Sequence, residues 1–522
     1  MYRLLIDIDV LIILAYFVTV MTVGVLSRQR GPATADEFFL SGRSLGWKAI
    51  ALSTVATNIH AGHFLGMAGS AYLYGLAQAN LEINAVFGIL MATFVFVPLY
   101  LRLKVTTISQ FFADRFGPRV ALAYSVLTMV LYGFLYLGTT LFWGAYAVNA
   151  LFPEQVAHIH ADPATRVLIM MAVLGAFSAT YTYLGGLRAV VRTDAIQFTL
   201  LVGGGFALLF LALQKLGGWS QLYQQTDLMH LHLPADHPKL PWTAIGAMLL
   251  LNLNYWGSNQ IILQRALAAK SVREAQIGLL ASGVLKYVMA LIIVVPAIAL
   301  AGILKDNALA DPDRAYPTLV NMLLPKGLRG LVLCGLFASL MSSVDSIFNS
   351  VSTLWSVDIF RGHLRPEATD AQVVAAGRRA ILVTLVAGMV FGGVQVYIKF
   401  TNPEFALTHW FNDTSYYIKV GFVILIASAV FLLRARPGLV LAMMLLAIPW
   451  KLALERLLPG VAYFNITALT ILSGLAVVAA ESLWRERKLP ALKEIFYSSD
   501  NQVILYGALL LASLVGLQVA FH

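Results

Sequence analysis

The chain has 522 residues, of which 59% are hydrophobic and 12% are charged. Ordinary soluble domains carry roughly 25% charged residues, so this composition excludes a typical water-soluble protein and indicates that lipid surrounds most of the chain. The formal net charge of +10 does not require a nucleic-acid partner, because basic residues gather in the cytoplasmic loops of membrane proteins.

Fourteen apolar segments predict membrane-spanning helices, and they make an all-α polytopic membrane protein the expected fold class. The first seven are expected near residues 6–28, 47–70, 75–101, 118–150, 165–185, 190–214 and 241–263. The other seven are expected near residues 276–304, 327–360, 376–400, 408–433, 437–455, 460–484 and 501–520. The runs are apolar almost without pause over about 20 residues, whereas strands of a membrane barrel alternate in polarity over about ten.

The basic residues indicate the orientation of these helices. Clusters fall in alternate loops, for example Arg102, Lys104, Arg115 and Arg119, and later Arg265, Lys270 and Arg273. Because Lys and Arg favour cytoplasmic loops, this pattern predicts that both termini lie outside the cytoplasm. The first apolar run lacks a cleavage site and is expected to be retained, which suits a multi-pass protein of a bacterial inner membrane.

Two of the predicted spans are unusually polar and rich in glycine. The segment from Ala51 to Tyr72 contains Asn58, His60 and His63, and residues 251–260 read LNLNYWGSNQ. Such segments at corresponding places in two halves are typical of discontinuous helices that line a site in the middle of the membrane. They are five helices apart, which predicts two inverted five-helix repeats at residues 47–214 and 241–433. Accessory helices are expected within residues 1–28 and 437–522.

A serine-rich face indicates a cation site. Ser339, Ser342 and Ser343 stand at positions i, i+3 and i+4 of one helix, so their hydroxyl groups share a face. Sodium prefers oxygen ligands, and backbone carbonyls of Ala56 and Ile59 in the unwound segment would complete the set. The alternative is that each serine bonds a carbonyl of its own helix or allows close helix packing.

Ionisable residues inside predicted spans are candidates for function, because burying a charge in the membrane is costly. Glu82 and Lys286, together with the amide of Asn252, offer acceptors and donors for several hydroxyl groups of a polyol. Tyr255 and Trp256 can cover the apolar face of a sugar ring, or they can be ordinary packing aromatics. His63 is open to three interpretations: a sugar contact, a proton carrier or a hydrogen-bonded core histidine.

An enzymatic activity is not expected. The sequence contains no His, Cys and carboxylate cluster with the spacing of metal ligands, no phosphate-binding Gly-Lys loop and no nucleophile elbow. The single cysteine, Cys334, excludes an intramolecular disulfide.

Several motifs resemble the sodium:solute symporter family, and specifically its sodium/glucose cotransporter branch. They include DEFFLSGRSLGWKAIALS from Asp36, NIHAGHFLGMAGSAY from Asn58 and SLMSSVDSIFNSVSTLWSVDIF from Ser339. The resemblance covers roughly residues 36–433. It implies a LeuT-like core, alternating access and sodium as the coupling ion, with the sodium site at Ala56, Ile59, Ser339, Ser342 and Ser343.

The resemblance also implies a solute site and a second ion site. The matching sugar contacts are His63, Glu82, Asn252, Lys286 and Asn412, and the gate and platform residues are Met67, Tyr255 and Trp256. A possible second sodium site consists of Asp194, Asp345 and Ser346; Asp345 departs from the branch, which has a hydroxyl residue there. The expected solute is a monosaccharide such as glucose or galactose. Inositol, sialic acid, a carboxylate, and a sodium-gated sugar sensor or leak remain alternatives, and the oligomeric state stays open.

Overall fold

The computed structural model describes residues 8–27, 34–60, 62–151, 153–305, 308–402, 407–432, 434–485, 496–497 and 499–521. The two ends of the predicted segment 6–28 lie outside the described residues. Within these ranges the chain forms helices and two isolated β-bridges, and it contains no strand. The predicted all-α fold class is therefore confirmed.

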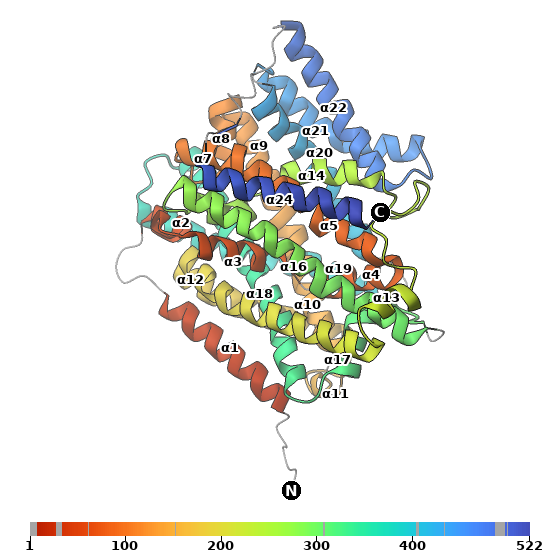
Figure 1. The fold of residues 1–522 in the computed structure, drawn as a ribbon. Coiled ribbons are helices and arrows are strands. Elements are labelled where there is room, and N and C mark those ends of the chain that lie inside the picture. Colours follow the sequence, from red (N-terminus) through yellow and green to blue (C-terminus); the bar gives the residue numbers. More distant parts are fainter. Residues whose placement is uncertain are drawn as a thin grey trace.

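The helices follow one another in chain order (Figure 1). The first half contains α1 (Ile8–Leu26), α2 (Ala35–Leu40), η1 (Ser41–Arg43), α3 (Trp47–Asn58), η2 (His63–Met67), α4 (Ala68–Tyr74), η3 (Gly75–Ala79), α5 (Asn80–Ile83), α6 (Ala85–Met91), η4 (Ala92–Phe96), α7 (Val97–Arg102), α8 (Ile108–Phe116), α9 (Pro118–Met129), η5 (Val130–Tyr136), α10 (Leu137–Leu151), α11 (Pro153–Val156) and α12 (Pro163–Leu216). The second half contains α13 (Ser220–Gln225), α14 (Ala244–Gly257), α15 (Gln260–Leu267), α16 (Val272–Leu304), η6 (Pro312–Arg314), α17 (Ala315–Leu323), α18 (Leu328–Thr353), η7 (Leu354–Leu364), α19 (Asp370–Thr401), α20 (Leu407–Phe431), α21 (Pro437–Leu457), α22 (Tyr463–Arg485) and α24 (Asn501–Ala520).

Eleven helices of the described chain are long and apolar enough to cross a membrane. The predicted count of fourteen is not confirmed, and the difference has two local causes. The predicted spans 165–185 and 190–214 lie in one run of 54 residues, α12, whose two helical halves meet at a kink at Gly186. The predicted spans 47–70 and 241–263 are each interrupted, so neither contains a continuous helix of spanning length.

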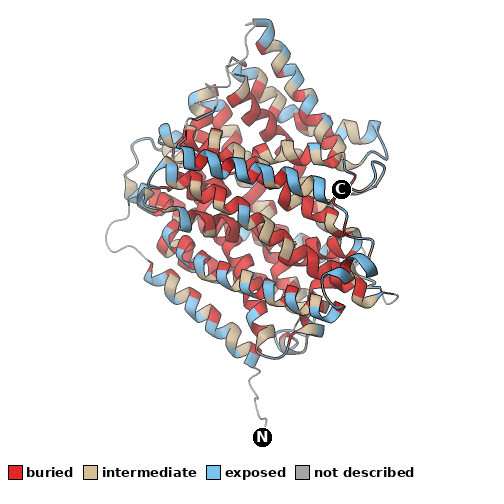
Figure 2. Ribbon diagram, in the orientation of Figure 1, coloured by how far each residue is buried: buried red, intermediate tan, exposed pale blue. Residues whose placement is uncertain are grey.

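Burial divides the helices into a centre and a periphery (Figure 2). In the continuous helical segment formed by α18 and η7, 94% of the most apolar 18-residue window is buried, and α18 packs against α1, α12 and α19. The corresponding windows of α1, α21 and α24 are only 22% buried. Their exposed apolar side chains suit contact with lipid, because lipid tails are as apolar as the side chains themselves.

Helix α1 is held at one end by a buried carboxylate. Asp9 accepts hydrogen bonds from the backbone N–H groups of Gly327 and Gly330, at 2.7 and 2.8 Å, at the start of α18. It also pairs with Arg329 at 2.8 Å. These contacts satisfy N–H groups that the first turn of a helix leaves without partners.

The bend in α12 depends on a glycine. Gly186 has φ 55° and ψ −150°, a region that is essentially restricted to glycine. A Cβ atom there would lie 2.3 Å from the carbonyl oxygen of Phe38 in α2. The bend thus seats α2 against α12.

Gly186→Ala is expected to lower the stability of the protein by at least about 1–3 kcal/mol, since backbone strain and the clash with Phe38 act together. The measurement is the midpoint of thermal unfolding in detergent. The matched control is Gly203→Ala in the same helix, where a Cβ atom meets nothing within 4 Å and where alanine favours the helix. A G186A midpoint equal to that of G203A would contradict the assignment of the bend to Gly186.

Both polar segments contain helix breaks, as the sequence predicts. Helix α3 ends at Asn58, Ile59 is extended with φ −94° and ψ 117°, and helical structure resumes at Gly62. Helix α14 ends at Gly257, and α15 begins at Gln260. Asn259 caps the start of α15, because its side chain accepts a hydrogen bond from the N–H of Ile261 at 3.0 Å. Side chains from other helices bind carbonyl oxygens at both breaks: Ser343 donates to that of Thr57, and Tyr100 donates to that of Gly257.

Candidate functional site

A cavity of about 220 Å³ lies beside the two helix breaks. Its walls come from elements that are far apart in the sequence: α3, η2, α5, α6, η5, α10, α14, α15, α16, α18, α20 and α22. The predicted residues that line it are His63, Glu82, Asn252, Tyr255, Trp256, Lys286 and Ser343. A second cavity of about 180 Å³ shares His60, His63 and Glu82 with it, and the predicted residues Met67 and Asn412 line only this second cavity.

A chain of polar contacts crosses the cavity from α5 to α14. The Lys286 ammonium forms an ion pair with Glu82 and also donates to the side-chain oxygen of Asn58. The amide nitrogen of Asn58 then donates to the hydroxyl of Tyr255 at 2.5 Å. Glu82 and Lys286 are almost fully buried, so each charge depends on the other for its neutralisation.

His63 extends this chain on the side of Glu82. Its Nδ1 accepts a hydrogen bond from the backbone N–H of His60 at 3.2 Å, and its Nε2 lies 3.5 Å from the Glu82 carboxylate. With Nδ1 as an acceptor, a neutral His63 carries its proton on Nε2, which faces the acid. His63 is thereby an oriented donor at the cavity.

Asn252 and Trp256 belong to the last two turns of α14. The Asn252 amide nitrogen donates to the carbonyls of Met248 and Asn84, at 2.9 and 3.2 Å. Trp256 is completely buried, and its ring packs edge-on against Tyr255 with centroids 5.8 Å apart. A Cβ atom on Gly88 would lie 2.5 Å from the Trp256 ring, so this glycine provides the space for the indole.

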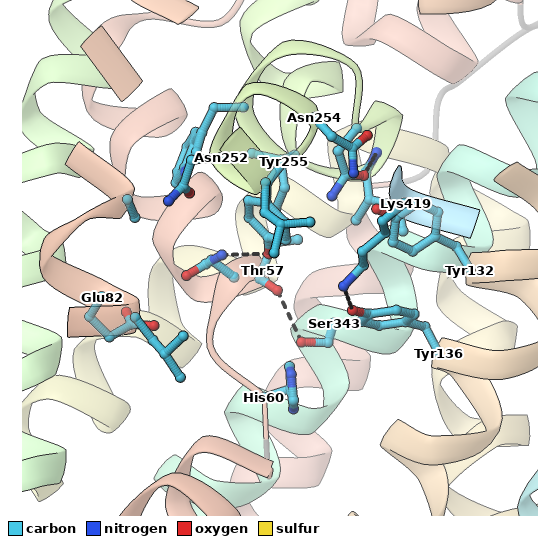
Figure 3. Close-up of a pocket in the computed structure, with 18 of the residues that line it drawn as sticks. Thr57, His60, Glu82, Tyr132, Tyr136, Asn252, Asn254, Tyr255, Ser343 and Lys419 are labelled. Atoms are coloured by element: carbon cyan, nitrogen blue, oxygen red, sulfur yellow. Dashed lines mark hydrogen bonds between the residues drawn. The ribbon is translucent and has the colours of Figure 1, made fainter. Parts of the chain in front are cut away.

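One of the three predicted serines, Ser343, lies at the break after α3. The hydroxyl of Ser343 in α18 donates to the carbonyl oxygen of Thr57 at 3.0 Å (Figure 3). It also lies 3.5 Å from the carbonyl oxygen of Ile59. Hydroxyl and carbonyl oxygens are the ligand types that sodium prefers, so the Ser343 hydroxyl and the two carbonyl oxygens fit the ion. Ser339 instead donates to the carbonyl of Leu336 at 2.8 Å, and Ser342 donates to Asp194 at 2.5 Å. The ligand set of Ala56, Ile59 and the three serines stays a prediction.

Asp194 lies next to a buried arginine. Arg265 of α15 is completely buried, lies 3.7 Å from the Asp194 carboxylate, and donates to Ser346 and, at 3.0 Å, to Ser53. The sequence placed Arg265 in a basic cytoplasmic loop, and this placement is wrong. The helix resumes at Gln260 and turns Arg265 into the core. A protein cation therefore occupies the neighbourhood of the predicted second sodium site.

Asp345 faces a different set of groups. Its carboxylate accepts hydrogen bonds from the hydroxyls of Ser178, Tyr181 and Thr182, all in the first half of α12. Asp194 belongs to the second half of the same helix, beyond the bend at Gly186. Asp345 thus does not share the hydroxyl partners of Asp194 and Ser346, and a common sodium site for all three stays a prediction.

Four residues that line the first cavity are not among the site residues predicted from the sequence. Asn58 and Thr57 lie within the polar segment before the helix break, and that polarity was the available signal. Lys419 is an ionisable residue inside an apolar span, and Tyr136 is its hydrogen-bond partner at 2.5 Å. No local pattern links Lys419 with Tyr136, because 283 residues separate them.

Comparison with known sequences shows several sodium-coupled relatives. Sodium/glucose cotransporter 4 from Mus musculus is 34% identical over 420 residues, which cover 73% of this chain and 60% of that protein. A sodium/glucose cotransporter from Vibrio parahaemolyticus is 31% identical over 474 residues, 81% of this chain and 85% of that protein. Another relative, at 32% identity over 76% of this chain and 65% of that protein, is sodium/myo-inositol cotransporter 2 from Mus musculus.

The fold is shared with solved sodium-coupled transporters. The substrate-bound, outward-open structure of a sodium-coupled sialic acid symporter matches 91% of this chain and 98% of its own, with a TM-score of 0.79 at 20% identity. This likeness confirms the predicted LeuT-like architecture. A sequence model described as "Sodium:solute symporter family" matches residues 38–445. The chain therefore belongs to the sodium:solute symporter family, a family of transporters whose coupling ion is sodium.

Proposed function

We propose that the chain is a sodium symporter of a monosaccharide that works by alternating access. Its relatives include sodium/glucose cotransporters, so the hexoses glucose and galactose are the first solutes to test. The cavity suits a small polar solute, since drug-sized ligands occupy pockets of roughly 300–1,000 Å³. His63, Glu82, Asn252 and Lys286 contact the sugar hydroxyl groups, Tyr255 and Trp256 cover its ring, and Met67 and Asn412 lie on its path.

The observation that carries this proposal is the end of helix α3. The carbonyls of Thr57 and Ile59 face Ser343, whereas the side chain of the residue between them, Asn58, contacts Lys286 in the cavity. An ion that draws the two carbonyls together also fixes Asn58. Sodium therefore favours the conformation in which the solute site is complete, which is a coupling free energy between two ligands.

The sodium gradient then drives accumulation of the solute. Sodium binds first and stabilises the form that binds the sugar, and the loaded carrier changes its access to the other side of the membrane. Each positive charge that moves inward gains about 2.3 kcal/mol per 100 mV of membrane potential. We place the protein in a bacterial inner membrane with both termini outside the cytoplasm.

Uptake by proteoliposomes tests the proposal. Labelled glucose, galactose, mannose and myo-inositol are offered with an inward gradient of sodium, potassium or protons. Accumulation above the equilibrium level that requires the sodium gradient supports symport. Sodium-dependent entry that stops at equilibrium supports a leak, and binding without entry supports a sensor; either result overturns the proposal.

Ser343→Ala is expected to raise the sodium concentration for half-maximal uptake about tenfold or more, because one oxygen is lost at the break after α3. The control is Ser352→Ala on the same helix, whose hydroxyl bonds only the carbonyl of Asn349. Sodium titrations of uptake compare the two variants with the wild type. Equal sodium dependence of S343A and S352A would remove Ser343 from the ion site.

A further inference from the structure

The described charges that line the first cavity do not balance. The only carboxylate is Glu82, and two ammonium groups, Lys286 and Lys419, share the same cavity. Glu82 is already paired with Lys286 and faces His63 at 3.5 Å. With neutral histidines, one positive charge therefore remains without a negative partner in the described lining. A buried charge without a counter-charge is costly, so a ligand that supplies a negative charge is favoured here.

The uncompensated ammonium is that of Lys419 in α20. It donates to the hydroxyl of Tyr136 at 2.5 Å and lies 5.0 Å from the ring centroids of Tyr136 and Tyr416. Neutral oxygens and rings hold a cation but do not neutralise it. An ammonium has three donors, so at least one N–H remains for a ligand.

The nearest acid along α20 does not serve Lys419. Asp413 lies six residues earlier, which puts it on another face of the helix. Its carboxylate instead pairs with the buried Lys451 of α21 at 2.6 Å. No ion pair found within the described part of the chain involves Lys419.

The wall around Lys419 also has an excess of hydrogen-bond donors. The Tyr132 hydroxyl and the Asn254 side-chain nitrogen are buried and have no partner among the described residues. Both residues line the cavity. Figure 3 shows Asn254, Tyr132, Tyr136 and Lys419 on the side of the cavity opposite Glu82. A carboxylate only accepts hydrogen bonds, so it matches a wall of donors better than a hydroxymethyl group does.

We propose that the transported monosaccharide carries a carboxylate, as a hexuronic acid does, and that Lys419 binds this group. This inference rests on the proposed sodium–sugar symport and names the class of its solute. The ring hydroxyl groups contact Glu82, Lys286 and Asn252, and the carboxylate lies at the opposite wall between Lys419 and the free donors of Tyr132 and Asn254. Binding then gives the Lys419 ammonium the negative partner that the described lining of the cavity lacks.

Matched pairs of solutes test this inference. Glucuronate and glucose differ at one carbon, and so do galacturonate and galactose. In proteoliposomes with an inward sodium gradient, the wild type is expected to prefer each acid over its neutral partner by about tenfold to a hundredfold, which is the range of a charged hydrogen bond. Lys419→Gln is expected to remove this preference, and Lys419→Arg to keep most of it. Lys48→Gln, on the exposed first turn of α3, controls for the loss of a lysine.

The outcomes separate this inference from the proposed function. Sodium-driven accumulation of glucose or galactose that uronates do not inhibit would overturn the carboxylate assignment and leave sugar symport intact. Loss of the preference for acids in K48Q as well as in K419Q would overturn the role of Lys419. If neither acids nor neutral sugars accumulate, the proposed function itself fails. If K419Q does not fold, the test rests on the preference of the wild type for acids over neutral sugars and on whether K419R keeps that preference.

Discussion

Replacing Lys286 with glutamine is expected to abolish sodium-driven uptake and to destabilise the protein by about 3–5 kcal/mol. Lys286 is the only described cation in contact with Glu82 apart from His63, and both members of the pair are buried. Its removal leaves a buried carboxylate without a partner and also frees Asn58 at the end of α3. Thermal unfolding in detergent and uptake by proteoliposomes measure the two effects.

The double variant Glu82→Gln/Lys286→Gln distinguishes stability from function. It removes both charges, so most of the lost stability is expected to return, whereas uptake is expected to stay absent because the solute loses two contacts. Normal uptake by K286Q would contradict the proposed solute site. A double variant no more stable than K286Q would show that the ion pair is not the source of the destabilisation.

Replacing Arg265 with methionine is expected to have a destabilising effect of similar size, about 3–5 kcal/mol. The guanidinium is completely buried against Asp194 and also donates to Ser53 and to the carbonyl of Ile261 at 2.5 Å. Its loss leaves Asp194 charged and unpaired at the centre of the helix bundle. The double variant Asp194→Asn/Arg265→Met is expected to recover most of the stability.

The same double variant tests the second sodium site. Because Arg265 already supplies the positive charge beside Asp194, we expect the steepness of the sodium dependence of uptake to stay that of the wild type. A lower Hill coefficient in the double variant would mean that Asp194 binds a transported ion. The control is Ser352→Ala, a buried change on α18 that does not touch the arginine.

The sequence predicted well what depends on neighbouring residues along the chain. The helix breaks follow from local polarity and glycine content, and they appear after Asn58 and after Gly257. The serine positions follow from helical periodicity, but only Ser343 faces the carbonyls at the break, whereas Ser339 and Ser342 bond Leu336 and Asp194. The helix breaks are set within a few residues, whereas the partner of each serine depends on tertiary contacts.

Features that depend on contacts between distant segments were less predictable. Arg265 was assigned to a loop because the sequence does not indicate where the interrupted helix resumes or which face it buries. Lys419 was visible as a charge within an apolar span, but its role depends on Tyr136, Tyr416 and the cavity wall. The exact count of fourteen spans is not confirmed, since the two halves of α12 meet at the kink at Gly186 without an intervening loop.

The attachment of α1 by Asp9 has a practical consequence for observing the transport cycle. Asp9 joins the start of α18, the helix that carries Ser343, to a helix whose outer face is exposed. A fluorescent or spin label on Leu14 of α1, whose side chain is exposed, is carried by a helix fastened to α18. Such a label reports displacement of the helix that carries Ser343.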